Sequence, residues 1–248
     1  MMLKKWEDLP EAMQKPEVRK YYNVLRKHRF SLVLKRAFDF LVALMMTILL
    51  LLPMLVIAVL IAADSPGGVF YRQVRVTAYG KEFRIHKFRT MVAGADRLGS
   101  QVTVGQDSRI TKIGAFLRKY RLDELPQVLD VLCGNMSYVG TRPEVPKYVE
   151  AYSDEMMATL LLPAGITSEA SIRFKDEAVL LEDADDVDKV YTEHVLPLKM
   201  KYNLASILSF NFFSDLQTML RTIIAVLGIK DYNDETTDVK EDIHYMHN

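Results

Sequence analysis

The chain has 248 residues, half of them hydrophobic, with 32 basic and 32 acidic side chains. This length allows one large domain or two small ones with a sizeable core. The single cysteine, Cys133, excludes an intramolecular disulfide and a thiolate metal cluster, which is typical of a reducing compartment. Charge is uneven, because residues 1–36 carry ten Lys or Arg against four acids, whereas residues 231–248 carry six acids against one lysine. The basic end predicts an anionic partner surface, and we expect membrane lipid and no nucleic acid because an apolar segment follows.

The basic segment itself, residues 1–36, is predicted to be interfacial. From residue 16 onward its apolar and basic side chains alternate in an imperfect helical pattern. Two interpretations stay open: a helix that lies on the membrane with its basic side against lipid head groups, or a helix packed on the globular part of the chain.

The next segment, residues 37–63, is predicted to enter the membrane. Its last 24 residues carry no charge, and about 20 apolar residues span the hydrocarbon layer of a bilayer. Pro53 lies in the middle and is expected to break or kink the helix. Basic residues flank the segment on both sides, which favours a re-entrant helix-break-helix over a single crossing, because Lys and Arg prefer the cytoplasmic side.

The remaining elements follow from periodicity and from the positions of glycine and proline. The pattern predicts, in chain order, strands at 69–76 and 82–88 joined by a turn at 78–80, a loop at 99–108, and helices at 110–120, after Pro126, at 145–162, at 185–208 with a bend or interruption at Pro197, and at 212–227. Residues 166–174 are expected to form a polar loop or strand. The apolar stripe of the last helix fits either the core or a helix lying on the bilayer.

These elements predict an α+β, mostly helical fold. It contains the N-terminal re-entrant membrane helix, a small β-hairpin and amphipathic interfacial helices around a compact globular domain at residues 64–228. The acidic tail, residues 229–248, is expected to be disordered.

Two adjacent carboxylates, Asp123 and Glu124, stand at or just before the helix that follows Pro126. Val128, Leu129 and Leu132 are expected on the buried face of that helix. Unpaired N–H groups and the positive end of the helix dipole keep carboxylates ionised, and Arg118 adds positive charge nearby. One carboxylate can then attack an electrophile while the other binds a divalent metal ion that prefers oxygen ligands, Mg²⁺ or Mn²⁺. The local sequence by itself favours the simpler interpretation that the pair caps the helix.

The wider sequence favours phosphoryl transfer. Separate groups of cations accompany the acidic pair, and the apolar segment places them at a membrane surface. The chain has no Walker-type loop, no Gly-x-Gly-x-x-Gly pattern and no zinc-ligand spacing, and His86 and His194 stand apart as expected surface residues. Cations, a hard metal and an aspartate nucleophile together are typical of a phosphoryl transfer divided into two steps.

A series of motifs also resembles a known family. They occur in this order: Phe70-Tyr71-Arg72-Gln73-Val74-Arg75, Lys87-Phe88-Arg89-Thr90-Met91, Asp107-Ser108-Arg109-Ile110-Thr111, Leu122-Asp123-Glu124-Leu125-Pro126-Gln127, Gly134-Asn135-Met136-Ser137, Val139-Gly140-Thr141-Arg142-Pro143 and Pro163-Ala164-Gly165-Ile166-Thr167. Together, over residues 34–225, they closely resemble the bacterial sugar transferases that are monotopic polyprenyl-phosphate phosphoglycosyl transferases.

The resemblance implies a re-entrant helix in the bacterial inner membrane and a catalytic domain on the cytoplasmic face. It also implies transfer of a sugar phosphate from a nucleotide diphosphate sugar, expected to carry uridine, to undecaprenyl phosphate as a first step of surface glycan synthesis. By resemblance Asp123 is the nucleophile and Glu124 engages Mg²⁺. The residues expected to bind the diphosphate are Lys87, Arg89, Arg118 and Arg142, and the residue expected near the nucleotide sugar is Arg173.

The chain departs from the family pattern at two positions near the site. Thr141 stands where a proline is usual, and Arg121 stands where a small residue usually precedes Leu-Asp-Glu. Two alternatives to the transferase are a non-catalytic membrane scaffold for glycan-assembly enzymes and an aspartyl phosphatase using the same carboxylate. The sequence makes no prediction about oligomeric state.

Overall fold

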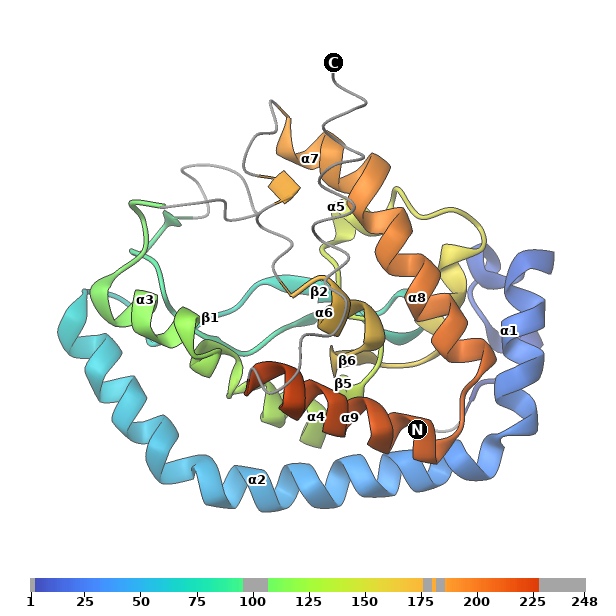
Figure 1. Ribbon diagram of the computed structural model, residues 1–248, viewed down its shortest axis with the longest axis horizontal. Helices are drawn as coiled ribbons and strands as arrows, with labels where there is room; N and C mark the ends of the chain where they lie inside the picture. Colours follow the sequence, from blue (N-terminus) through green and yellow to red (C-terminus); the bar gives the residue numbers. More distant parts are fainter. Residues whose placement is uncertain (1–2, 96–106, 176–179, 182–185, 228–248) are drawn as a thin grey trace.

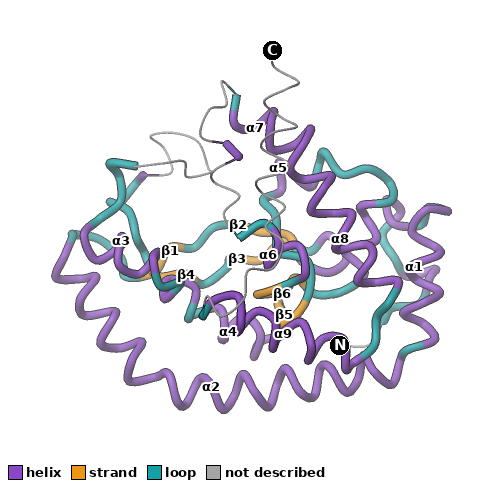
Figure 2. Tube along the Cα trace, viewed as in Figure 1, coloured by secondary structure: helices purple, strands orange, loops and turns teal. Residues whose placement is uncertain are grey.

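The structure is a computed structural model that describes residues 3–95, 107–175, 180–181 and 186–227. The predicted acidic tail and most of the predicted loop at 99–108 lie outside the described residues. Helices dominate and the strands are short and few, so the mostly helical α+β prediction is confirmed (Figure 2). The helices are α1 (Pro16–Lys27), α2 (Arg29–Asp64), α3 (Lys112–Lys119), α4 (Gln127–Cys133), α5 (Pro146–Val149), α6 (Glu169–Arg173), α7 (Val187–Val190), α8 (Leu196–Leu208) and α9 (Phe212–Val226). The strands are β1 (Phe70–Tyr71), β2 (Val74–Val76), β3 (Glu82–Arg84), β4 (Lys87–Phe88), β5 (Met136–Val139) and β6 (Ala164–Thr167).

Helix α2 contains the predicted membrane segment as one uninterrupted helix of 36 residues. The predicted break at Pro53 is therefore wrong, because the chain remains helical on both sides of the proline. A proline lacks one N–H donor and crowds the preceding turn, which bends a helix without necessarily ending it. Figure 1 shows α2 curving beneath the other elements, so that both of its ends approach the same globular body.

Both ends of α2 are attached to that body. Near its start, Arg36 donates hydrogen bonds to the carbonyls of Val131 (2.8 Å) and Leu132 (3.1 Å). At its end, the Asp64 carboxylate accepts a 3.0 Å bond from the backbone N–H of Ile113 in α3. One side of the helix between these points packs on the body, whereas the other exposes a continuous set of large apolar side chains. Only 11% of the most apolar 18-residue window is buried, and the helix is long and apolar enough to cross a membrane.

The predicted hairpin is present, with an interruption. Strand β2 pairs antiparallel with β3, and β1 pairs antiparallel with β4. The turn contains Tyr79, whose positive φ of 61° allows the chain to reverse within three residues. Between β3 and β4 the backbone N–H of His86 bonds to a side chain of α4. This change of partner directs β4 toward the segment before α4.

Strands β5 and β6 form a parallel pair, with Met136 opposite Ala164 and Val139 opposite Thr167. Just beyond β5 the backbone of Gly140 lies against Gly165. A Cβ atom added to Gly165 would lie 2.2 Å from the backbone nitrogen of Gly140, so glycine is required for this approach. The pair places the segment after β5 beside α6.

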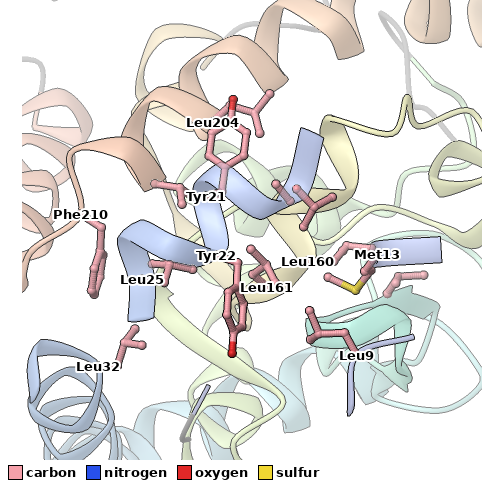
Figure 3. Close-up of a cluster of buried hydrophobic side chains, with 14 residues drawn as sticks. Leu9, Met13, Tyr21, Tyr22, Leu25, Leu32, Leu160, Leu161, Leu204 and Phe210 are labelled. Atoms are coloured by element: carbon pink, nitrogen blue, oxygen red, sulfur yellow. The ribbon is translucent and has the colours of Figure 1, made fainter. Parts of the chain in front are cut away.

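The N-terminal region packs on the protein rather than standing apart from it. Figure 3 shows side chains of α1 meeting residues from the 3₁₀ turn Met156–Leu161 and from α8 in one cluster. Val18, Tyr21, Tyr22 and Leu25 are each at most 3% exposed. Of the two interpretations of this region, packing on the globular part is therefore the one observed for the apolar side of α1.

Three predicted helical regions differ in detail. The helix expected at 145–162 is divided into the single turn of α5 and a 3₁₀ turn, Met156–Leu161. The helix expected at 185–208 continues through a π-helical turn, Tyr191–Val195, into α8, because Pro197 cannot donate to the preceding turn. The segment expected to be a loop or strand at 166–174 is half strand, β6, and half helix, α6.

Helix α9 forms as predicted, but none of its residues is fully buried. Phe213, Leu220, Ile223 and Val226 are each more than half exposed. The core interpretation of this apolar stripe is therefore wrong, and α9 leaves an apolar face open beside α2, which it contacts.

Candidate active site

Asp123 and Glu124 lie in the 3₁₀ turn Leu122–Glu124, three residues before α4 begins. Arg121 precedes the turn with a left-handed φ of 56°, which reverses the chain after α3. The predicted helix after Pro126 is confirmed, but no side-chain hydrogen bond caps its N-terminus. The capping interpretation is therefore not supported, and the carboxylates have other partners.

Those partners are two of the predicted cations. The Lys87 Nζ lies 3.2 Å from Asp123 Oδ2 and 3.1 Å from Glu124 Oε1. Arg142 forms a two-pronged pair with Glu124, through Nη2 to Oε1 and through Nη1 to Oε2 at 3.3 Å. The Asp123 side chain is 8% exposed and that of Glu124 is 13% exposed, whereas Lys87 and Arg142 are 26% and 34% exposed. The cations thus cover two recessed carboxylates from the solvent side.

The charges of this cluster favour the ionised form of Glu124. Burial opposes ionisation of Glu124, but Arg142 and Lys87 together outweigh it and hold the pKa of Glu124 well below its usual range. Arg118 belongs to the same electrostatic environment. Burial lowers the pKa of its guanidinium, and the negative charge of Asp123 acts in the opposite direction. Glu124 is therefore an anion at neutral pH, surrounded by groups that bind anions.

Sequence reasoning missed the contacts that hold Arg142 in place. The segment after it is fixed by Glu144, which is 5% exposed and accepts a 2.6 Å hydrogen bond from the Tyr191 hydroxyl. Lys199 Nζ donates to that hydroxyl at 3.0 Å, and Arg75 Nη1 donates to the Pro143 carbonyl at 3.0 Å. These partners lie tens of residues from Arg142 in the chain, so no local pattern signals them.

His86 was expected to be a surface residue, but it is tied to α4. Its Nδ1 lies 2.8 Å from Asp130 Oδ1, and its backbone N–H donates to Asp130 Oδ2 at 2.8 Å. Asp130 is completely buried. This pair fixes the backbone immediately before Lys87, and neither residue stands out in the sequence.

Two predicted substrate-binding residues do not meet this cluster. Arg89 is 7% exposed, and its guanidinium donates to Ser65, to the Pro66 carbonyl and to the Gly68 carbonyl at 2.5–3.0 Å. In this structure the donors of Arg89 hold the segment that follows α2, so Arg89 is not brought to the carboxylates, and its binding of the diphosphate stays a prediction. Arg173 pairs with Glu169 at 3.1 Å and lies 4.8 Å from the centre of the Tyr202 ring. It faces α8 rather than the carboxylates.

Asp123 and Glu124 are also the residues that fit a divalent cation. Carboxylate oxygens are the ligands that Mg²⁺ prefers, and Mg²⁺ is typically held by one or two carboxylates together with substrate phosphates. Within the described part of the chain no cluster of three or more Asp, Glu, His or Cys side chains forms a complete cage. The donor set therefore fits an ion completed by substrate.

Comparison with known proteins agrees with this chemistry. The model of the family described as "Bacterial sugar transferase" matches residues 30–229. A Bacillus subtilis protein named putative undecaprenyl-phosphate N-acetylgalactosaminyl 1-phosphate transferase is 38% identical over 154 residues, covering 58% of this chain and 86% of its own length.

Two further relatives cover more of the chain. The sugar transferase EpsL of Bacillus subtilis is 32% identical over 84% of this chain and 95% of its own length. The UDP-N-acetylgalactosamine-undecaprenyl-phosphate N-acetylgalactosaminephosphotransferase of Aeromonas hydrophila is 34% identical over 78% of this chain and 44% of its own length. Because the family model covers most of the chain and two of these three relatives are named as sugar-phosphate transferases, this chain belongs to the bacterial sugar transferase family of phosphoglycosyl transferases.

Proposed function

We propose that this enzyme transfers a sugar 1-phosphate from a UDP-sugar to undecaprenyl phosphate through a covalent intermediate on Asp123. The observation that carries the proposal is the pair of recessed carboxylates covered by Lys87 and Arg142. The names of relatives that act on UDP-sugars and undecaprenyl phosphate support the choice of substrates.

In the first step an Asp123 carboxylate oxygen attacks the sugar-bearing phosphorus of the donor. A new O–P bond forms, the bond to the bridging oxygen breaks, and uridine monophosphate leaves with the electron pair. Lys87 and Arg142 exchange their carboxylate contacts for contacts with phosphate oxygens, which neutralises charge as the substrate binds. Arg118 adds positive charge on the Asp123 side.

In the second step a phosphate oxygen of the lipid acceptor attacks the same phosphorus, and the Asp123 carboxylate leaves. Dividing the transfer into two displacements is typical of an aspartate nucleophile. Glu124 would hold Mg²⁺, or Mn²⁺ in its place, while Asp123 carries out the attack, and this ion would supply additional neutralisation of the diphosphate charge.

The acceptor requires the site to lie at a membrane, and we propose that α2 is re-entrant. Both of its ends are bonded to the same globular body, at Arg36 and at Asp64. A helix crossing the bilayer would carry its end to the opposite face, away from α3. The exposed apolar sides of α2 and α9 would then face lipid. The proposed membrane is the inner membrane of a bacterium, with the carboxylates on its cytoplasmic face.

The replacement Asp123→Asn tests the proposed intermediate. We expect loss of covalent labelling by a donor radiolabelled in its sugar, because an amide is a poor nucleophile at phosphorus. Wild-type protein should label without acceptor and release uridine monophosphate in equal amount. Full labelling of the variant would refute the aspartyl intermediate, and steady release of inorganic phosphate without lipid would identify a phosphatase. Wild-type protein that releases no monophosphate with any donor would favour the scaffold alternative.

The orientation of α2 is tested by cysteine labelling in a Cys133→Ser background. Cysteines placed at the exposed Phe30 and Lys81 should both react with a membrane-impermeant reagent from the cytoplasmic side. Reaction from opposite sides would show that the helix crosses the bilayer.

A further inference from the structure

A cavity lies next to the segment that carries Arg142. It has a volume of about 300 Å³ and is lined by α8, α9 and the segments that follow β5 and β6. Figure 1 shows α6, α8 and α9 gathered around this end of the parallel pair. Residues just beyond the carboxyl ends of both strands line it, Gly140 and Thr141 after β5 and Ser168 after β6. Ligands commonly bind outside the carboxyl ends of parallel strands.

The cavity and the carboxylate cluster share one segment of chain. Thr141 lines the cavity, and the next residue, Arg142, binds Glu124. A substrate phosphate held by Arg142 is therefore bound by the residue next in sequence to Thr141 of the cavity lining.

The charged side chains that line the cavity neutralise one another. Lys35 pairs with Asp215 at 2.6 Å, and Arg221 pairs with Glu169 at 2.9 Å. The paired charges of the cavity differ from those of the carboxylate cluster, where cations are positioned to bind phosphate. A neutral ligand suits it better than an anion, because an anion would compete with carboxylates that are already paired.

The other polar residues of the lining offer hydrogen bonds to a neutral ligand. Asn203 is 5% exposed and lines the cavity, and within the described part of the chain its side-chain oxygen has no hydrogen-bond partner. Its amide nitrogen has only a 3.8 Å contact with the sulfur of Met200. Buried polar atoms normally have hydrogen-bond partners, so the Asn203 amide is available to bind a ligand in the cavity. Hydroxyls of Ser206 and Thr218 also line it.

We propose that this cavity holds the neutral sugar ring of the donor, and that Asn203 helps to select the sugar. The proposal rests on the transferase function proposed above. A volume of 300 Å³ is at the lower end of the range of ligand pockets, about 300–1,000 Å³, and suits one ring rather than a complete nucleotide sugar. A sugar ring is preferred to a uracil base because neither aromatic ring of the lining is open for stacking. Arg173 covers the ring of Tyr202, and Phe210 is 4% exposed and packs edge-on against His28.

Protection of a cysteine tests occupancy without requiring turnover. Ser206 is exposed on α8, so Ser206→Cys in a Cys133→Ser background should fold and react with a thiol reagent. The probes are UDP-glucose, UDP-galactose, UDP-N-acetylgalactosamine and UDP. We expect at least one UDP-sugar to slow alkylation fivefold or more, and UDP, which lacks the sugar, to slow it less than twofold. Equal alkylation rates with every probe, or protection by free monosaccharides but by no UDP-sugar, would overturn the proposal.

Selectivity is tested by Asn203→Leu, with Asn23→Leu on the exposed face of α1 as the matched control. We expect Asn203→Leu to lower kcat/KM for the preferred UDP-sugar tenfold or more and to reduce the preference among the three donors. Inhibition by UDP should change less than twofold. If Asn203→Leu does not fold, Ser206→Phe should produce the same change by narrowing the cavity. Unchanged donor preference in a folded, active variant would refute the sugar assignment while leaving the aspartyl mechanism intact, since that mechanism fails only if Asp123→Asn still labels.

Discussion

Replacement of Lys87 by methionine removes a cation that contacts both carboxylates. The Nζ lies 3.2 Å from Asp123 Oδ2 and 3.1 Å from Glu124 Oε1, and methionine keeps most of the side-chain volume. Hydrogen bonds to charged groups contribute about 1.5–3 kcal/mol, and the partly exposed position of Lys87 suggests a loss near 1.5 kcal/mol. For a chain of this size that lowers Tm by about 3–6 °C.

Catalysis should suffer more than stability. Removing one preorganised group that stabilises developing charge typically costs about 10²–10³-fold in rate. We therefore expect Lys87→Met to slow formation of the covalent adduct by about that factor at pH 7, measured in a single turnover with radiolabelled donor. The exposed Lys81 on the hairpin turn provides the matched control, Lys81→Met, which should retain the wild-type rate.

The variant should also change the pH dependence. Burial opposes ionisation of Glu124, and Arg142 and Lys87 hold its pKa well below the usual value, so the wild-type carboxylate stays ionised into the acid range. A carboxyl group whose pKa is lower in the folded protein than in the unfolded chain stabilises the folded state at any pH above its pKa in the unfolded chain. This stabilisation is lost as the pH falls through the pKa of the group in the folded protein. Without Lys87 the pKa of Glu124 rises, so the acid limb of adduct formation should move to higher pH and the difference in Tm between wild type and variant should vanish in strong acid. Adduct formation within threefold of wild type at pH 7, with an unshifted acid limb, would refute this account of the site.

Two further predictions concern the scaffold and the membrane face. Gly165→Ala places a Cβ atom 2.2 Å from the Gly140 backbone nitrogen, and because the backbone cannot move aside freely we expect the unfolding free energy to fall by about 1–3 kcal/mol. The control variant Gly68→Ala, whose Cβ would meet only an atom at 3.8 Å, should unfold at the wild-type temperature. Equal thermal unfolding of the two variants would contradict the close approach of the strands. An environment-sensitive fluorophore attached through Leu220→Cys in a Cys133→Ser background should shift to shorter emission wavelengths in lipid nanodiscs. The reason is that transfer of each large apolar side chain on the exposed face of α9 into lipid is favourable by about 1.5–3 kcal/mol. A label attached through Lys81→Cys should not shift, and identical spectra at the two positions would exclude α9 from the membrane.

Much of the fold follows from local sequence patterns. Alternation at 69–76 and 82–88 with a glycine-containing turn between them predicts the hairpin, and the basic helix before Asp123 forms as expected at α3. Prolines and glycines act within their own turn of chain, so Pro126 and Gly134 correctly predict the limits of α4. The same local reasoning fails at 145–162, where packing against α1 and α8 stabilises a 3₁₀ turn in place of a long helix.

For the site, the sequence by itself determined the candidate groups for the chemistry, and only the tertiary structure decided which of them meet. Asp123 and Glu124 are adjacent in the chain, and an acidic pair among cations predicts phosphate chemistry without any coordinates. Lys87 and Arg142 reach that pair whereas Arg89, two residues from Lys87, is turned to the end of α2. The charge and chemical type of each side chain follow from the sequence directly. The direction in which a side chain points depends on contacts between segments far apart in the chain, and those contacts exist only after folding.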